Sequence, residues 1–212
     1  MLLNIKQSIE RPVINKQNKS EIDFIVKNVA PFLDSIFNTK VYIEWEKASA
    51  TNTTSEGCNI RTDFLLYDTY QELGCGEVKV GNVCAKLLDE DRARLGEMLK
   101  KQLHDRIFHA KTQNEFKTFG FFIYNSTIEI YTCEFTNNKE YVFVLLRLIT
   151  LPTLKTSYTA MEEALEIMMS FKEMIIASKH DERLSEVPYI YHNYISFLKP
   201  TVSMVEMSQH DS

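Results

Sequence analysis

Helix-like and strand-like apolar patterns follow one another along this chain in an order that few architectures accommodate. Helical spacing marks three segments, and alternating or continuous apolar runs of strand length mark six. In chain order they read helix, strand, two strands, helix, three strands, helix: residues 20–37, 41–46, 63–68, 73–80, 89–108, 118–124, 128–135, 141–149 and from 159 onward. This order predicts an α/β domain with a mixed central β-sheet flanked by helices.

Local signals set the expected ends of these segments. Ser20 is a capping residue for the first helix, and Pro31 predicts a kink within it. Thr159 and Glu162 form a capping-box pattern at the start of the last helix, whose methionine-rich face is typical of core packing. Residues 48–59 are rich in Thr, Ser and Asn and predict a loop.

The length of 212 residues favours a single domain. We expect an N-terminal arm over residues 1–19, one α/β domain over 20–200 and a flexible tail over 201–212, because both ends are weakly patterned. The net charge of −5 argues against a broad basic surface for sequence-independent nucleic-acid binding, although it leaves room for a local basic groove.

The cysteines and the N-terminus indicate in which cellular compartment the protein is found. The 4 cysteines contain no C-x-x-C pair, so they favour reduced thiols over a zinc site. The N-terminus lacks a signal-peptide pattern, and the longest apolar run, 141–151, is interrupted by Arg147 and is too short to cross a bilayer. We therefore expect an intracellular protein, cytoplasmic or nuclear, with no membrane contact.

Glycine is scarce and clustered. Of 6 glycines in the chain, three (Gly74, Gly76 and Gly81) lie within eight residues of one another. They surround Glu77 and Lys79, which project from the same face of the expected strand because residues two apart share a face. Gly76 faces the other side, where we expect a helix to pack closely against it.

The preceding strand supplies a second carboxylate for this face. If Asp68 pairs with Glu72 across a short turn, counting back along both strands places Asp63 opposite Glu77. Opposed carboxylates repel unless a cation lies between them, and Mg²⁺ binds one or two carboxylates together with water and phosphate. With Lys79 beside them, these residues suit metal-assisted hydrolysis of a phosphodiester.

A second E-x-K sequence, Glu115-Phe116-Lys117, lies in a polar connection with no aspartate on a preceding strand, and we assign it no function. The alternative for the first copy is a structural one: an exposed hairpin on which Lys79 neutralises Asp63 and Glu77. The spacing alone leaves both interpretations open.

Asp63, Glu77 and Lys79, on a hairpin between two helices, resemble the PD-(D/E)XK nuclease superfamily over roughly residues 20–179. A Gly-Glu-x-Lys strand leading to a helix with Asp91-x-x-Arg94-Leu95-Gly96 is also similar to an expanded fungal branch of such proteins. The resemblance implies a restriction-endonuclease-like α-β-β-β-α-β core, here with extra strands, and Thr62 stands where the family name has proline.

The same resemblance implies roles for particular residues. Asp63 and Glu77 would be the metal ligands and Lys79 the catalytic lysine, with Mg²⁺ or Mn²⁺ as cofactor. Glu21, at the start of the first helix, and Gln102, on the helix after the motif, match accessory positions of the family. The function implied is a metal-dependent nuclease-like protein, an Mg²⁺-dependent endonuclease hydrolysing phosphodiester bonds in DNA or RNA. The alternative is a catalytically inactive nuclease-fold binding or scaffold protein.

Other polar residues receive structural interpretations. Acidic residues at 89–91 open a helix, where they are favoured in any case. The basic residues of that helix, Arg92 to Arg106, could contact phosphates or solvate its outer face, and we favour solvation. The five histidines lack a zinc-binding spacing and predict structural or surface roles.

Overall fold

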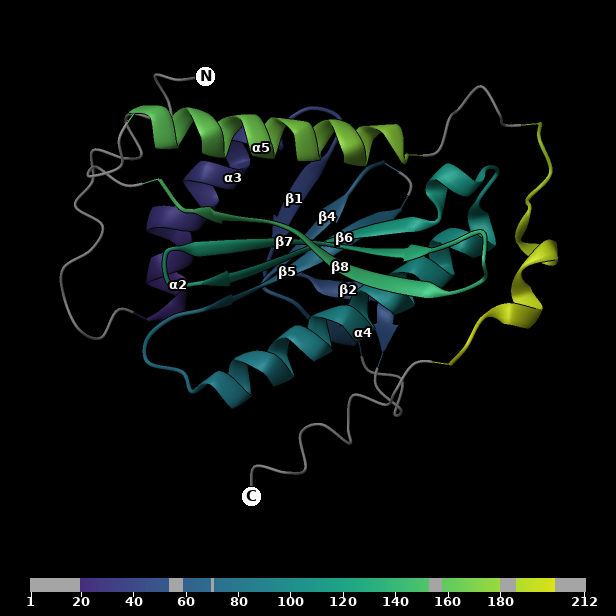
Figure 1. Cartoon of the computed structure of the whole chain (residues 1–212), viewed down its shortest axis with the longest axis horizontal. Helices are drawn as coiled ribbons and strands as arrows, with labels where there is room; N and C mark the ends of the chain where they lie inside the picture. The colour runs from purple at the N-terminus through teal and green to yellow at the C-terminus, as the bar shows by residue number, and fades with distance from the viewer. Residues whose placement is uncertain (1–19, 54–58, 70, 153–157, 180–185, 201–212) are drawn as a thin grey trace.

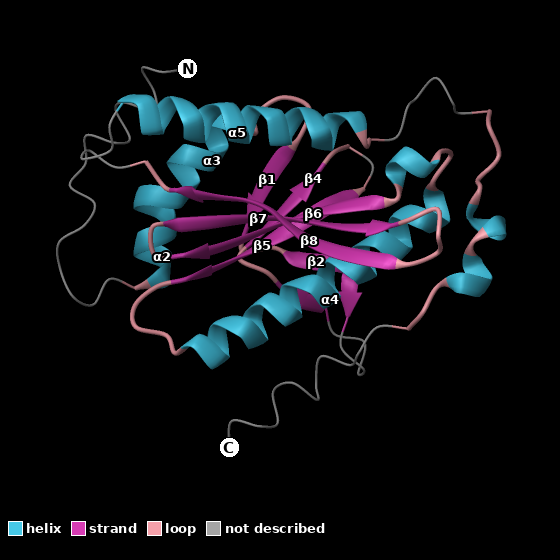
Figure 2. Cartoon of the chain, in the orientation of Figure 1, coloured by secondary structure: helices cyan, strands magenta, loops and turns pink. Residues whose placement is uncertain are grey.

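The computed structural model describes residues 20–53, 59–69, 71–152, 158–179 and 186–200, so the expected arm and tail lie outside the described residues. Helices cover both faces of a six-stranded sheet with strand order β1-β4-β5-β6-β7-β8, which confirms the α/β class (Figures 1 and 2). The elements are α2 (Glu21–Phe24), η1 (Ile25–Val29), α3 (Ala30–Ile36), β1 (Tyr42–Trp45), β2 (Ala48–Thr53), β3 (Asn59–Arg61), β4 (Phe64–Tyr67), β5 (Glu72–Lys79), α4 (Ala85–His109), η2 (Gln113–Glu115), β6 (Lys117–Tyr124), β7 (Thr127–Phe135), β8 (Tyr141–Thr150), α5 (Tyr158–Ala177), η4 (Tyr191–Asn193) and η5 (Ile195–Phe197).

The sheet is mixed because one connection crosses over. β5 pairs with β6 in parallel, and α4 makes the crossover between them, whereas the other neighbouring strands are antiparallel. Read through α3, β1, β4, β5, α4 and β6, the chain follows the expected helix–three strands–helix–strand order, and β7 and β8 extend the sheet beyond it.

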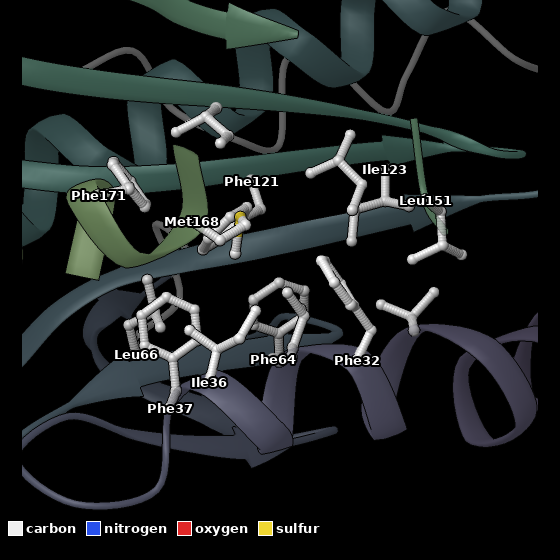
Figure 3. Packing of buried hydrophobic residues seen from close by; sticks show 14 of the residues in the cluster. Phe32, Ile36, Phe37, Phe64, Leu66, Phe121, Ile123, Leu151, Met168 and Phe171 are labelled. Carbon is white, nitrogen blue, oxygen red and sulfur yellow. The ribbon is translucent and has the colours of Figure 1, made fainter. Parts of the chain in front are cut away.

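The face covered by the first helix and α5 holds the larger apolar core. Phe64 and Phe121 lie at its centre, between Ile36 of α3 and Met168 of α5 (Figure 3). Met168 and Phe171 are buried, but Met174 is 38% exposed, so the methionine-rich face of the last helix contributes only part of its length to the core.

The opposite face is covered by α4, which packs a stripe of fully buried side chains onto β5, β6 and β7. The helix begins at Ala85, four residues before its expected start, and its buried stripe contains the predicted apolar residues: Leu95, Met98, Leu99, Leu103 and Ile107. The expected helix–sheet layer therefore forms on both sides of β5.

The first helix begins as expected, with the Ser20 hydroxyl accepting a hydrogen bond from the Asp23 amide at 3.2 Å. The disturbance expected at Pro31 takes the form of one π-helical turn, Ile25–Val29, directly before the helix that carries it. A π turn lets the helix continue although proline has no N–H to donate.

The expectation of a loop over residues 48–59 is wrong at both ends of that range. β2 and β3 pair there as a small two-stranded sheet. The Glu72 carboxylate on β5 anchors β2, because it accepts hydrogen bonds from the Ser49 hydroxyl, the Ala50 amide and the Thr51 hydroxyl at 2.6–2.7 Å. These small polar residues of β2 donate hydrogen bonds to a strand of the other sheet, and strand propensity does not reveal such long-range contacts.

The two glycines of β5 permit close packing on the side away from Glu77. A Cβ on Gly76 would lie 2.1 Å from the Phe64 ring, and one on Gly74 would lie 1.8 Å from the Phe119 carbonyl oxygen. The neighbour at Gly76 is thus an aromatic ring of the adjacent strand, in place of the helix expected there.

Candidate active site

The turn of the β4–β5 hairpin differs from the expected one, because Tyr67, and not Asp68, pairs with Glu72. A register shift between Leu66 and Tyr67 then restores the expected pairing from Leu66–Gly74 onward. Phe64 pairs with Gly76 and Leu65 with Cys75, so Asp63, directly before β4, lies at the level of Glu77. The Asp63 carboxylate accepts a hydrogen bond from the Val78 amide at 2.6 Å. This bond holds the Asp63 side chain against the end of β5.

Glu77 and Lys79 project from the end of β5 toward the N-terminal half of α4. The Lys79 ammonium lies 3.5 Å from a Glu77 carboxylate oxygen and 4.0 Å from a carboxylate oxygen of Asp91 on α4. Glu77 is buried, whereas the Lys79 side chain retains partial access to solvent. The lysine therefore lies between two acids that come from different elements.

Asp91 is a residue of this site that sequence reasoning assigned to helix capping. It is buried, and its second oxygen pairs with the Arg94 guanidinium at 2.5 Å. The sequence signal was its spacing, since Asp91 follows Leu88 by three positions and precedes Leu95 by four, on the buried stripe of the helix. A charged residue on such a stripe needs a partner, and Lys79 and Arg94 are its partners.

Glu21 reaches the same end of the sheet from the start of α2. Burial raises the pKa of its carboxyl, and the negative charges of Asp63 and Asp91 raise it further, while Lys79 acts in the opposite direction. Because these interactions fall off with distance, the accessory acid predicted from the first helix belongs to the same electrostatic cluster as Asp63 and Lys79.

The carboxylates of this cluster, Glu21, Asp63 and Glu77, bring several negative charges together where solvent has limited access. Burial raises the pKa of Glu77 to about 7, with the Asp63 charge adding to the effect and Lys79 opposing it. Burial also raises the pKa of Asp63, against the hydrogen bond from Val78. Burial acts to lower the pKa of Lys79, but the surrounding carboxylates outweigh it and leave that pKa raised.

Gln102 lies away from this cluster. Its side-chain amide donates to the Glu72 carboxylate at 2.8 Å and to the Gly74 carbonyl at 3.4 Å, near the opposite end of β5. The structure thus places Asp63, Glu77 and Lys79 at one end of β5, with Glu21 within range of their charges, and it places Gln102 with the anchor of the β2–β3 hairpin.

The basic residues of α4 have specific structural partners. Arg92 pairs with Glu129 of β7 at 2.7 Å, and Arg106 is fully buried, donating to the Ser178 carbonyl at 2.6 Å. The expectation that this set solvates the outer face is therefore wrong for Arg106. Arg94, half exposed beside Asp91, is the basic side chain of the set that contacts the site.

The second E-x-K sequence is structural. Glu115 is buried and caps η2, accepting hydrogen bonds from the Lys111 and Thr112 amides at 2.9 Å, while Lys117 pairs with Glu134 at 2.9 Å on the neighbouring strand. Its two side chains therefore have separate partners on separate elements.

Within the described residues there is no group of three or more His, Cys, Asp or Glu side chains arranged to hold a metal. Asp63 and Glu77 supply two carboxylates. Mg²⁺ commonly binds one or two carboxylates and fills its remaining positions with water and substrate phosphate. The donor set therefore fits an ion shared with a bound phosphate, and it does not form a closed protein cage.

No protein-family model matches the chain, and no curated protein matches its sequence. Among solved structures, the chain is similar to one described as the cryo-EM structure of a DrdV–DNA complex, with a TM-score of 0.46 and 14% identity over 81% of this chain. The match covers 14% of the DrdV chain. No helix in the described part of the chain has the length and apolar character needed to cross a membrane.

Proposed function

We propose that this chain is a metal-dependent nuclease of the PD-(D/E)XK type that hydrolyses phosphodiester bonds in DNA or RNA. Asp63 and Glu77 would hold Mg²⁺ or Mn²⁺, and Lys79 would contact the reacting phosphate. The observation that supports the proposal is the pairing of Glu77 with Lys79 at the end of β5, where the Asp63 carboxylate accepts a hydrogen bond from the amide of Val78, the residue between them.

The chain's own residues have distinct parts in such a reaction. A bound divalent ion supplies Lewis acidity and an activated water. Val78 fixes one Asp63 oxygen, which leaves its other oxygen for a ligand. Lys79, flanked by Glu77 and Asp91, stays an ammonium and can stabilise the negative charge that develops on the phosphate.

Arg94 adds a second cationic group at the rim. Its guanidinium is half exposed and is oriented by Asp91. An arginine held this way can bind a non-bridging phosphate oxygen or a neighbouring phosphate with little loss of side-chain freedom.

The test is cleavage of labelled DNA and RNA, single- and double-stranded, by the full chain. We expect cutting with Mg²⁺ or Mn²⁺ and none with EDTA. Glu77→Gln and Lys79→Ala should each lower the rate by about 100-fold or more, because the first weakens binding of the metal ion and the second removes the positive charge at the reacting phosphate.

Lys117→Ala is the matched control, since it alters the lysine of the second E-x-K sequence and removes only a surface ion pair. It should retain the wild-type rate. Metal-dependent cutting that persists at the wild-type rate in both Glu77→Gln and Lys79→Ala would refute the assignment.

The second candidate is a nuclease-fold binding or scaffold protein without catalysis. Lys79 already pairs with Glu77, and Asp63 is bonded to the backbone, so the cluster can serve as an internal ion-pair group. Calorimetric titration with Mg²⁺ separates the two: no binding in the millimolar range or tighter favours the scaffold.

A further inference from the structure

The two edges of the central sheet are built differently. The β1 edge is four residues long, carries Glu44 paired with Lys47, and is followed by Glu46, which has a positive φ of 51°. A short, charged strand of this kind discourages further pairing. The β8 edge runs over ten residues, contains a single charged side chain, Arg147, and has no proline.

β8 also exposes apolar side chains on both faces of the sheet. Val142, Phe143, Val144, Leu145 and Leu148 are 36%, 41%, 40%, 45% and 58% exposed. In Figure 1 this strand faces the viewer, and no helix lies across it. Among the described residues β8 pairs only with β7, so its outer backbone groups lie uncovered beside these five exposed side chains, whereas Ile149 is buried in the core.

We propose that a second copy of this chain occupies the edge, with the two β8 strands antiparallel across a two-fold axis. Such an interface is self-complementary, because the same strand serves both copies. It joins the two sheets into one and uses both β8 edges, which leaves only the blunted β1 edges outside. The assembly therefore closes as a dimer.

Side-chain positions favour antiparallel pairing over the whole strand. Phe143 contacts Gly96 of α4, and Leu148 lies opposite Glu129, which pairs with Arg92 of α4, so both project from the α4 face. If Tyr141 of one copy lies opposite Thr150 of the other, Phe143 lies opposite Leu148 on that face. The register shift near Ile130 and Tyr131 makes this pairing possible, because it brings Leu148 to the same face of β8 as Phe143, five residues earlier. Residues that project from the α4 face of one copy then lie opposite residues of that face in the other.

The same register separates like charges. Arg147 of one copy then lies opposite Val144 of the other, and the two guanidinium groups are offset by about 10 Å along the strands. A parallel in-register pairing would place the two arginines side by side, which is unfavourable. The single charge on the strand thus selects the antiparallel, closed arrangement.

The contact is small and depends on backbone pairing. Ten residues at about 3.4 Å each give a length of about 34 Å, and the spacing of packed sheets gives the edge a thickness of about 10 Å. The resulting area, about 340 Å² per copy, is below the roughly 800 Å² per partner of a standard specific interface, so we expect a dimer of low affinity.

The test is the mass of the full chain by light scattering after size-exclusion chromatography, over a range of micromolar concentrations. We expect about 49 kDa, twice the 24.7 kDa of one chain. Leu148→Lys and Leu145→Lys should each give 24.7 kDa, because a dimer would bury two unpaired ammonium groups. Both positions are exposed, so circular dichroism and the melting temperature should stay close to wild type.

Tyr42→Lys is the matched control, since Tyr42 is 40% exposed on the opposite edge strand. It should remain a dimer. A wild-type chain that is monomeric throughout the range refutes the proposal, and this result would also be expected if another protein or the chain's own ends covered β8. A dimer that survives both leucine substitutions, or that Tyr42→Lys dissociates, refutes it equally.

Discussion

At the scale of single residues, alanine substitutions at two glycines are expected to change the free energy of unfolding in opposite directions. A Cβ on Gly74 would meet the backbone of β6 at 1.8 Å, whereas a Cβ on Gly96 in α4 would make an ordinary contact of 3.5 Å with the Phe143 ring. We expect Gly74→Ala to lower the free energy of unfolding by about 3 kcal/mol or more, because β5 and β6 must separate to admit it. Gly96→Ala should raise the same quantity by up to about 1 kcal/mol through helix propensity.

Urea unfolding of both variants measures the difference. Equal stabilities for Gly74→Ala and Gly96→Ala would contradict the close approach of β5 and β6.

The residues of the site differ in whether their positions could be predicted from the sequence. The alternation of strand residues places Glu77 and Lys79 on one face, as expected. Asp63 reaches the level of Glu77 only because a register shift next to Leu66 compensates for a turn that pairs Tyr67, and not Asp68, with Glu72. Asp91 is part of the pattern that carries the family resemblance, but the sequence assigns it no role in the site, because acids at a helix start need no functional explanation. Gln102 lies eleven residues further along the same stripe, about 16 Å at the rise of an α-helix, and therefore reaches a different part of β5.

At the scale of elements, the N-terminal half of α4 packs against the end of β5 and places Asp91 beside Lys79. We expect Asp91→Asn to reduce the turnover rate about 10-fold with little change in KM, since Lys79 and Arg94 lose the acid that orients them but keep their charge. The measurement is a steady-state comparison on the substrate identified by the cleavage assay.

The neighbouring Glu90 provides the control, because it pairs with Lys86 on the exposed side of the same helix. Glu90→Gln should leave both kinetic constants unchanged. If Asp91→Asn changes only the melting temperature and neither kinetic constant, Asp91 serves α4 packing alone.

The elements that sequence predicted well are those with a strong apolar period. The buried stripe of α4 and the strands β4 to β8 follow the expected ranges within a few residues. The β2–β3 hairpin was not predictable, because what stabilises it is the carboxylate of Glu72 on a distant strand. The π turn before Pro31 was predictable as a disturbance, but its type depends on how the helix packs.

At the scale of the whole molecule, His104 makes folding sensitive to acid. Its ring lies between α4 and β8, hydrogen-bonded to the Tyr141 hydroxyl at 2.6 Å, with Lys100 nearby on α4. Burial, together with the charge of Lys100, lowers the pKa of His104 from 6.5 to about 4. The unfolded chain therefore binds a proton between these values that the folded chain does not.

The sign of the effect follows from linkage. Because the unfolded state binds more protons, this group's contribution to stability is complete above about pH 6.5 and is lost as the pH falls toward 4. His104→Gln keeps a polar partner for Tyr141 but cannot be protonated. On acidification from pH 7 to about pH 5, its free energy of unfolding should fall less than that of wild type, by about 1 kcal/mol after allowance for solvent screening of a half-buried ring.

His109→Gln, at an exposed position on the same helix, should follow the wild-type profile. Urea unfolding at the two pH values gives the comparison directly. Parallel profiles for wild type and His104→Gln would show that the ring takes up a proton as readily in the folded chain as in the unfolded chain, which would contradict the lowered pKa.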